Sequence, residues 1–535
     1  MAMSLALHNV SFVLDNGQTL FKEINFSLTH RVNALVGNNG VGKSVLAQLM
    51  AQRLPVSNGV VLGGAMTTYV PQLWPGSPTA IVKTVLGLEE PLNAIDRIES
   101  GEPQPDDFAV AESWWDWPVQ LQAALKTTGF EFNLDLARSI QSFSGGEQFR
   151  LSWAAAILTD ADVFILDEPT NHLDQNGRER LTEWIYNSRK KFIVVSHDRT
   201  FLHSVDAIYE LTPDELHHHP GSYSAYFARK RQRWESQSEA LSYARKVDKR
   251  AKSKAQDALE KQQQRVASGK ARATRENWSI IERNAAKEAG EKNLRSQKVL
   301  REHRASDAGA RVRETASARE WFEPVAFSLP ASRVSKNKAV LSLKNLIIGF
   351  QEPISKPLSI QLKGPFCLNI TGSNGSGKSA LIKTIIGEIS PIEGTAQTHV
   401  DSAYLDQHFT EFLQEKSAIE NVCLAQPGLC EKEGRDRLAW LRLRNTKAEV
   451  PFGKLSAGEQ LKVALASKLL GHHTPQLLIL DEPTNHLDLD SVIALEKALE
   501  AFEGAMILVS HDAQFAEKQH ITHILNMETG KLILR

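Results

Sequence analysis

The residues best suited to chemistry in this sequence are two glycine-rich loops that end in Lys-Ser. Each loop fits the pattern G-x-x-x-x-G-K-S, the first over residues 37–44 and the second over residues 372–379. In such a loop glycines let backbone N–H groups approach phosphate oxygens, the lysine reaches the outer phosphates and the serine hydroxyl binds Mg²⁺. The loops therefore predict two sites for ATP and Mg²⁺. The residues expected to bind are Gly37, Asn38, Gly40, Gly42, Lys43 and Ser44, and in the second loop Gly372, Asn374, Gly375, Gly377, Lys378 and Ser379.

A second repeated feature is an apolar run that ends in Asp-Glu. The runs cover residues 163–166 and 477–480 and have the length of buried strands. An aspartate at a strand end can hold Mg²⁺ through its water shell, and the adjacent glutamate can orient and deprotonate the attacking water. The metal-site prediction is Asp167 and Asp481, and the catalytic prediction is Glu168 and Glu482.

Glutamine and histidine also recur at matching distances. Gln72 and Gln407 each follow the loop lysine by 29 residues, where they are expected to bind the metal and sense the attacking water. His197 and His511 each follow the aspartate by 30 residues, inside Ser-His-Asp. We expect both histidines to contact the γ-phosphate and to act in catalysis.

A third repeated segment is Ser-Gly-Gly-Glu-Gln at residues 144–148 and Ser-Ala-Gly-Glu-Gln at residues 456–460. A serine followed by small residues at the start of a helix makes a site for an anion. Taken alone, each segment would also serve as an ordinary helix cap. The residues predicted to bind nucleotide are Ser144, Gly146, Ser456 and Gly458.

The repeated features imply an internal duplication, because the two loops lie 335 residues apart with matching neighbours. We predict a first nucleotide-binding domain over residues 1–222, a linker over 223–322 and a second domain over 323–535. The alternating residues 5–12 favour an edge strand. About 23 more residues separate the glutamine from the serine segment in the first copy, and the stretch 89–110 is expected to form an exposed loop or short hairpin.

The linker is basic and has the composition of a helix. Between positions 229 and 320 it holds 25 Lys/Arg against 13 Asp/Glu, and no proline occurs from residue 221 to 323. Strong helix formers dominate, so two long helices that reverse between Gly269 and Gly290 are expected. A solvated, partly disordered linker is the alternative. Aromatic residues at both ends could dock the segment onto a domain: Tyr223, Tyr226, Trp234, Trp321 and Phe322.

The bulk composition fits a cytoplasmic globular protein. Of 535 residues, 42% are hydrophobic and 23% charged, and no apolar run is long enough to span a membrane. No signal peptide is expected. The three cysteines match no metal-ligand spacing, so free thiols are expected. His217–His219 could bind a metal but favour a solvated loop, and Trp114, Trp115 and Trp117 favour packing over base stacking.

Both copies resemble ATP-binding cassettes, and Asp-Glu-Pro-Thr-Asn-His-Leu-Asp occurs at residues 167–174 and again at 481–488. Together with the charged linker, this octapeptide is similar to that of the ABC-F subfamily. The resemblance implies two α/β cassettes that pair head to tail within a monomer. The Lys43 site would be closed by Ser456, and the Lys378 site by Ser144.

The resemblance also implies a function, because most members of the subfamily act on the ribosome. There the linker hairpin reaches toward tRNA and the peptidyl-transferase region from the exit-side tRNA site. Ribosome, rRNA and tRNA are therefore the expected partners, in translation regulation or in protection against antibiotics.

This chain departs from the family pattern in two places. An aromatic residue usually stacks on adenine after the first strand. Phe350 fits that position in the second copy, whereas the first copy has Leu14, with Phe12 nearby. The insertion in the first copy is short compared with the arm of some members.

Two other functions fit tandem cassettes: the ATPase subunit of a membrane transporter, and a DNA-associated ATPase of the same subfamily. A transporter subunit does not require a linker with a net charge of +12, whereas a segment that faces rRNA or tRNA does. The chain ends soon after the second copy, so no nucleic-acid-binding extension is expected there, which weighs against DNA.

Overall fold

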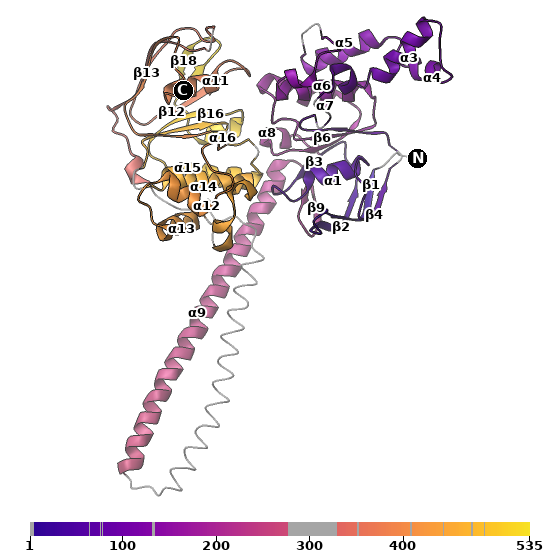
Figure 1. The fold of residues 1–535 in the computed structure, drawn as a ribbon. Helices are drawn as coiled ribbons and strands as arrows, with labels where there is room; N and C mark the ends of the chain where they lie inside the picture. The colour runs from indigo at the N-terminus through magenta and orange to yellow at the C-terminus, as the bar shows by residue number, and fades with distance from the viewer. Residues whose placement is uncertain are drawn as a thin grey trace. The chain divides into compact units, whose positions relative to one another are not determined.

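The computed structural model describes residues 5–275 and 329–535, except for positions 64, 75, 77, 78, 131–133, 350, 351, 407, 408, 442, 444, 472, 473 and 486. The chain divides into two compact units. One unit joins residues 1–226 to residues 324–535, and the other is residues 227–323. Within the first unit, residues 5–222 are called the first lobe and residues 329–535 the second lobe (Figure 1).

The first lobe is built on a six-stranded sheet with strand order β5-β6-β7-β3-β8-β9. Only β8 and β9 run antiparallel; the other neighbours are parallel. Every residue of β3, β6 and β8 is buried, as expected for a parallel sheet covered on both faces. The strands are β3 (Val32–Val36), β5 (Thr67–Val70), β6 (Val163–Asp167), β7 (Lys191–Val195), β8 (Ala207–Leu211) and β9 (Leu216–Pro220).

A three-stranded antiparallel sheet, ordered β2-β1-β4, completes the sheets of this lobe. Its strands are β1 (Ala6–Val13), β2 (Thr19–Ser27) and β4 (Asn58–Leu62). The expectation of an edge strand at residues 5–12 is wrong, because β1 pairs on both sides. Its alternation reflects one solvated face of the sheet, which a central antiparallel strand can also have.

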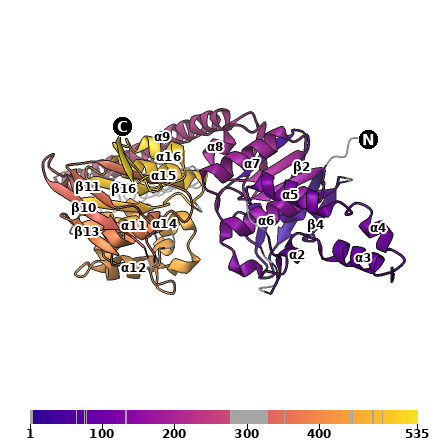
Figure 2. The same ribbon diagram turned by 90° about the horizontal axis from the view of Figure 1, so that it is seen from above.

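Helices form the rest of the first lobe. The stretch 89–110, expected to be a loop or hairpin, instead contains α3 (Glu89–Glu99) and α4 (Asp107–Ala111). Figure 2 shows these two helices side by side. The sequence favours a helix because Leu92 and Ile95 bury one face, while Arg97 Nε donates to Asp107 Oδ2 at 2.9 Å. The other helices are α1 (Lys43–Met50), α2 (Val82–Val85), α5 (Trp117–Thr128), α6 (Gly145–Leu158), α7 (Gln175–Asn187) and α8 (Arg199–Leu202).

The second lobe repeats this plan, which confirms the predicted duplication and the α/β fold class. Its six-stranded sheet has the order β14-β15-β16-β12-β17-β18, and its antiparallel sheet the order β11-β10-β13. The strands are β10 (Ala339–Ile347), β11 (Leu358–Lys363), β12 (Cys367–Thr371), β13 (Glu393–Thr398), β14 (Ser402–Leu405), β15 (Leu477–Asp481), β16 (Ala505–Val509), β17 (His523–Asn526) and β18 (Lys531–Leu534). The helices are α11 (Lys378–Ile385), α12 (Ala418–Ala425), α13 (Glu431–Trp440), α14 (Ala457–Leu469), α15 (Leu489–Glu500) and α16 (Ala513–Lys518).

One continuous helix, α9 (Tyr223–Arg275), leads out of the first lobe. At 1.5 Å per residue its 53 residues span about 80 Å. Tyr223 and Tyr226 are buried, and the Tyr226 hydroxyl donates to Glu210 Oε1 at 2.8 Å. The helical linker is thus confirmed over this range, as is the docking of Tyr223 and Tyr226 onto the first lobe. The helix passes Gly269; the expected reversal beyond Arg275, the second linker helix, Trp321 and Phe322 lie outside the described residues.

The histidine cluster and two of the three tryptophans serve packing. Residues 217–219 lie in strand β9 rather than in the expected loop, because they pair with β8. The His218 ring stacks on Tyr209, and His219 faces Glu210 at 3.4 Å. Trp114 and Trp117 pack against the helical core, while Trp115 is 49% exposed.

Other expectations concern thiols, metals and membranes. The three cysteines are free. Across the described ranges no group of three or more His, Cys, Asp or Glu side chains could hold a metal ion. None of the helices in the described part of the chain has the length and apolarity that crossing a bilayer would require.

Candidate nucleotide sites

The first glycine loop joins β3 to α1, in the strand–loop–helix context that this motif needs. Gly42 caps α1 with a φ of 100°, a left-handed conformation, and an added Cβ there would lie 2.3 Å from a methyl group of Leu20. The Lys43 ammonium donates to the carbonyl of Gly37 at 2.8 Å and of Asn38 at 3.2 Å. It is therefore held over the loop, where phosphate oxygens could replace these carbonyls.

The second loop has the same geometry with one difference. The Lys378 ammonium donates to the carbonyls of Gly372 at 2.8 Å and Ser373 at 3.0 Å. However, the Ser373 N–H donates to Glu528 Oε1 at 3.0 Å, so a carboxylate contacts this loop. Burial lowers the pKa of both loop lysines, although nearby carboxylates oppose the shift.

The two predicted metal-site aspartates end the buried strands β6 and β15. Asp167 Oδ2 accepts from the Tyr69 hydroxyl at 2.8 Å. Burial raises the pKa of Asp167, and hydrogen bonds from Tyr69 and Ser44 partly offset it. Asp481 has the same pattern with Ser379. A hydroxyl beside a carboxylate is an oxygen set that suits Mg²⁺, so the residues present fit this ion.

Tyr69 was not identified from the sequence, although the repeat contains a pattern that marks it. Tyr69 lies three residues before Gln72, and Tyr404 lies three residues before Gln407. This pair is a further repeat that places a hydroxyl-bearing ring beside each aspartate. The pKa of both tyrosines is raised, first by burial and next by the charge of Asp167 or Asp481.

The two predicted catalytic glutamates share an unusual backbone conformation. Glu168 has a φ of 46° and Glu482 a φ of 48°, which is strained for a residue with a side chain. Each is held there because its N–H donates to the end of the neighbouring strand, at Val195 O (2.8 Å) or Val509 O (2.9 Å). Non-glycine residues in this region tend to occur at functional sites.

Each glutamate faces the histidine predicted to assist it. Glu168 Oε1 lies 3.4 Å from His197 Nε2, and Glu482 Oε1 lies 3.3 Å from His511 Nε2. Burial raises the pKa of Glu168 to about 8 and that of Glu482 to about 7. Burial also lowers the pKa of His511 to about 4. At neutral pH His511 is thus neutral, and the pKa values of the two glutamates suit the exchange of a proton with water.

This raised pKa predicts a pH-dependent effect of Glu168→Gln on stability. The pKa of Glu168 moves from 4.5 to about 8 on folding, so the folded state binds more protons within that window and stability falls as pH rises through it. At about 1.4 kcal/mol per pKa unit, the ionised side chain destabilises the fold by several kcal/mol above pH 8. We expect the glutamine variant to melt at a higher temperature than the wild type at pH 8.5, with the difference shrinking toward pH 4.5.

Thermal denaturation across this pH range measures the effect, and Glu99→Gln, at an exposed position of α3, is the control. A difference in melting temperature that does not change with pH would contradict the raised pKa.

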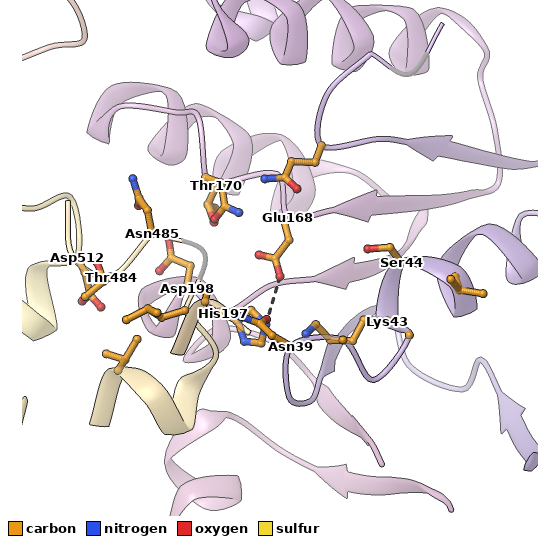
Figure 3. A pocket seen from close by; sticks show the side chains of 18 of the residues that line it. Asn39, Lys43, Ser44, Glu168, Thr170, His197, Asp198, Thr484, Asn485 and Asp512 are labelled. Carbon is orange, nitrogen blue, oxygen red and sulfur yellow. Dashed lines mark ion pairs between the residues drawn. The ribbon is translucent and has the colours of Figure 1, made fainter. Parts of the chain in front are cut away.

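Each site is a pocket lined by residues of both lobes. The first has a volume of about 560 Å³ and is shown in Figure 3, where the dashed line joins Glu168 and His197. The second, of about 510 Å³, surrounds Lys378. The Lys43 pocket is lined from the first lobe by Lys43, Ser44, Gln72, Glu168 and His197, and from the second lobe by Ala457, Thr484, Asn485, Leu487, Val492 and Asp512. The Lys378 pocket is lined from the second lobe by Lys378, Ser379, Asp481, Glu482 and His511, and from the first lobe by Ser144, Gly145, Gly146, Asn171, His172 and Leu173.

The serine segments begin helices α6 and α14, each with a capping box. Ser144 Oγ accepts from the Glu147 N–H at 3.4 Å, and the Glu147 carboxylate accepts from the Ser144 N–H at 2.7 Å. Ser456 and Glu459 repeat this pattern. The structure brings Ser144 and Gly146 to the Lys378 pocket, whereas the lining of the Lys43 pocket includes Ala457, the residue after Ser456.

Only some of the residues that we expect to lie near the adenine ring belong to the described part of the chain. Leu14 and Leu20 line the Lys43 pocket, while the ring of Phe12 is tilted against that of Phe21, with centroids 6.4 Å apart. Phe350 and Gln407 lie outside the described residues. Both therefore remain predictions.

Contacts between the lobes add three residues that the sequence did not single out: Asn39, His172 and Asp488. The Asn39 N–H donates to Asp488 Oδ2 at 3.0 Å, and Asn374 Nδ2 donates to His172 O at 3.3 Å. Both acceptors belong to the repeated octapeptide. Its second half therefore contacts the glycine loop of the opposite lobe, a role that repetition alone does not reveal.

Comparison with known proteins agrees with this geometry. The family model described as ABC transporter matches residues 21–171 and 355–485. The probable ATP-binding protein YheS of Escherichia coli K12 is 30% identical over 515 residues, which cover 94% of this chain and 74% of YheS. ABC transporter F family member 4 of Arabidopsis thaliana is 28% identical over 541 residues, covering 94% and 70%.

A similar fold is found among solved structures. The complex of archaeal ribosome recycling factor aABCE1 with the archaeal ribosomal stalk protein aP1 gives a TM-score of 0.53, at 18% identity. The match covers 97% of this chain and 87% of that one. At this identity the likeness concerns the fold of the two lobes.

Proposed function

The chain belongs to the ATP-binding cassette family, as an ATPase of the ABC-F type with two cassettes on one chain, and from this premise we propose that it is an ATP-gated ribosome-binding factor. Its two lobes are the cassettes. ATP in both pockets brings the lobes together, the closed form binds the ribosome near the exit-side tRNA, and hydrolysis releases it. The linker then contacts tRNA or rRNA in the cytoplasm, where the factor regulates translation or protects against antibiotics.

The proposed roles within each pocket follow the geometry above. The loop lysine and the backbone N–H groups hold the phosphates, and the serine segment of the opposite lobe closes the site. Mg²⁺, when bound by the serine and aspartate oxygens, neutralises phosphate charge. Glu168 and Glu482 orient the attacking water and accept its proton, while His197 and His511 contact the γ-phosphate. The proposed domain boundaries are 1–222, 223–322 and 323–535.

The observation that carries the proposal is the charge of α9. Between Arg229 and Arg275 it holds 15 Lys/Arg against five Asp/Glu, along one unbroken helix. A helix with so few apolar side chains has little capacity to form a core, whereas its charge suits the phosphates of a nucleic acid. The relative of similar fold named above is a ribosome recycling factor, which is consistent with this partner.

A different function would make different use of the same cassettes. A transporter subunit would bind a membrane partner and would not need the linker charge. A DNA-associated ATPase would use the linker on a duplex. The test therefore includes ribosomes and DNA as separate partners.

The experiment uses the ATP-trapped chain, in which both glutamates are glutamine. We expect it to pellet with ribosomes, and its binding to fall steeply as salt rises, because each neutralised phosphate releases counterions. Reversing the charge of Lys270, Arg272 and Arg275, near the far end of the described part of α9, should lower ribosome occupancy without lowering ATP binding.

The matched control reverses three exposed lysines on the lobes, Lys22, Lys344 and Lys363, which changes the net charge equally. Only the α9 variant should lose ribosome binding. If the ATP-trapped chain without charge reversals does not pellet with ribosomes at any salt concentration, the translation-factor proposal is wrong. Retention on DNA under those conditions would favour the DNA-associated function.

A further inference from the structure

The histidine turn of the second lobe is held by arginines of the first lobe. This turn is the dipeptide His511–Asp512, between β16 and α16. The His511 N–H donates to Glu482 Oε2 at 3.1 Å, so the turn fixes the position of the predicted catalytic carboxylate. On its other side, Arg178 Nη1 donates to His511 O at 3.3 Å and Arg199 Nη2 donates to Asp512 Oδ2 at 3.0 Å.

Arg199 is an almost fully buried cation between the lobes. Its side chain is 2% exposed, and Nη1 lies 2.7 Å from Glu496 Oε1, which is 3% exposed. Glu496 also contacts the Lys518 ammonium at 2.6 Å. Asp512 caps α16, because its Oδ1 accepts from the Phe515 N–H at 2.9 Å. The two ends of the guanidinium therefore bind one carboxylate on α15 and another at the start of α16.

Arg178 completes the contact from α7. Its Nε donates to Leu173 O at 3.1 Å and its Nη1 to Asp198 Oδ2 at 3.1 Å. Asp198 belongs to the histidine turn of the first lobe itself. Arg178 therefore contacts both histidine turns, whereas the guanidinium of Arg199 pairs with Glu496 and Asp512 of the second lobe.

The second lobe offers no equivalent arginines. Asp174 and Asp488 cap α7 and α15 in the same way, which aligns Arg178 with Val492. Asp198 and Asp512 cap α8 and α16, which aligns Arg199 with Ala513. Valine and alanine cannot donate hydrogen bonds from their side chains. The support of the histidine turns is thus asymmetric, and the first lobe supplies it.

We infer that Arg199 is a positioning residue for ATP hydrolysis in the Lys378 site: through Asp512 it holds the His511 turn against Glu482, so that hydrolysis in the second lobe requires the first lobe in place. The inference rests on the proposed role of Glu482. Asp512 also lines the Lys43 pocket. The histidine turn of the Lys43 pocket is His197–Asp198, and Arg178 of the same lobe contacts it through Asp198. The Lys43 site therefore depends less on Arg199.

The experiment separates the two sites by leaving one of them active. In a Glu168→Gln chain only the Lys378 site hydrolyses, and in a Glu482→Gln chain only the Lys43 site does. In the first background we expect Arg199→Met to lower kcat roughly 10-fold or more, since a misplacement of a reacting group by about 1 Å can cost about 100-fold. KM for ATP should stay within about twofold, because Arg199 touches neither glycine loop. In the second background kcat should change less than about twofold.

Two further variants keep the test decisive. Arg199→Lys keeps the charge but, as a point donor, cannot bridge both carboxylates, so its kcat should fall between those of the wild type and Arg199→Met. Lys518→Met removes the other cation from Glu496 without touching the His511 turn, and it should leave kcat unchanged in both backgrounds. This variant controls for general loss of the buried ion cluster.

Equal losses in both backgrounds, a loss confined to KM, or an unchanged kcat would each overturn the inference. Failure of the proposed function looks different. If the chain with both glutamates replaced still hydrolyses ATP at the wild-type rate, the role of Glu482 is wrong, whatever Arg199 does. If ribosomes are not bound but the kcat pattern appears, the inference about Arg199 stands alone.

Discussion

A chain that carries both Glu168→Gln and Glu482→Gln will bind ATP and turn it over at least about 100-fold more slowly than the wild type, within the range for loss of a general base. Both carboxylates lie in pockets with the loop lysine. Both have a raised pKa and a neighbouring histidine, which suits proton transfer near neutral pH. Glutamine keeps the shape of the side chain but accepts no proton from water.

Phosphate release measures the rate, and retention of labelled ATP measures binding. Each single variant should keep part of the activity, because the other pocket still hydrolyses. Glu99→Gln, far from both pockets in sequence and exposed on α3, should behave as the wild type. A double variant with wild-type turnover would show that neither glutamate is the base.

The second large effect is expected across the lobes. Replacing Ser456 by aspartate should weaken ATP binding in the Lys43 site roughly 10- to 100-fold, while Ser144→Asp should weaken the Lys378 site. Aspartate is as good a helix N-cap as serine, so α14 or α6 should keep its start. Its carboxylate, however, would replace the hydroxyl that we propose to donate to the phosphates, and a hydrogen bond to a charged group contributes about 1.5–3 kcal/mol.

Site-resolved binding requires one glycine loop to be disabled. In a Lys378→Ala chain only the Lys43 site binds, and there Ser456→Asp should lower affinity while Ser144→Asp should not. The Lys43→Ala chain should give the opposite result. Ser→Asn at each position is the matched control, because asparagine caps the helix without adding charge. A loss confined to the loop of the same lobe would contradict the composite pockets.

Much of the site could be predicted because most of its candidate functional residues lie in short contiguous motifs. The loop around Lys43, the strand end at Asp167–Glu168 and the helix start at Ser144 each depend on local sequence. The buried strands at residues 163–166 and 477–480, the described part of the linker helix and the repeat of the whole lobe followed from the same patterns.

Other features depend on partners that are distant in sequence. Glu89–Glu99 contains Pro91 near its start, and its composition resembles a loop, but Leu92 and Ile95 find a core and the stretch is helical. Residues 217–219 form a strand because β8 offers them hydrogen bonds. Arg199 carries no motif at all. Its importance appears only when Glu496, almost 300 positions later, is folded beside it.

The buried ion pair between Arg199 and Glu496 also decides which surfaces can associate. In Glu496's place the first lobe has Thr182, and in Arg199's place the second lobe has Ala513. Two second lobes brought together would leave Glu496 with Lys518 of its own lobe but without the arginine. Two first lobes would leave Arg199 with Asp198, which takes the place of Asp512, but without the glutamate. Either like pairing therefore loses the ion pair between Arg199 and Glu496, so the unlike surfaces are favoured. The first lobe of one molecule could also fit the second lobe of another. The linker limits such pairing between molecules, because it raises the effective concentration of the partner lobe on the same chain.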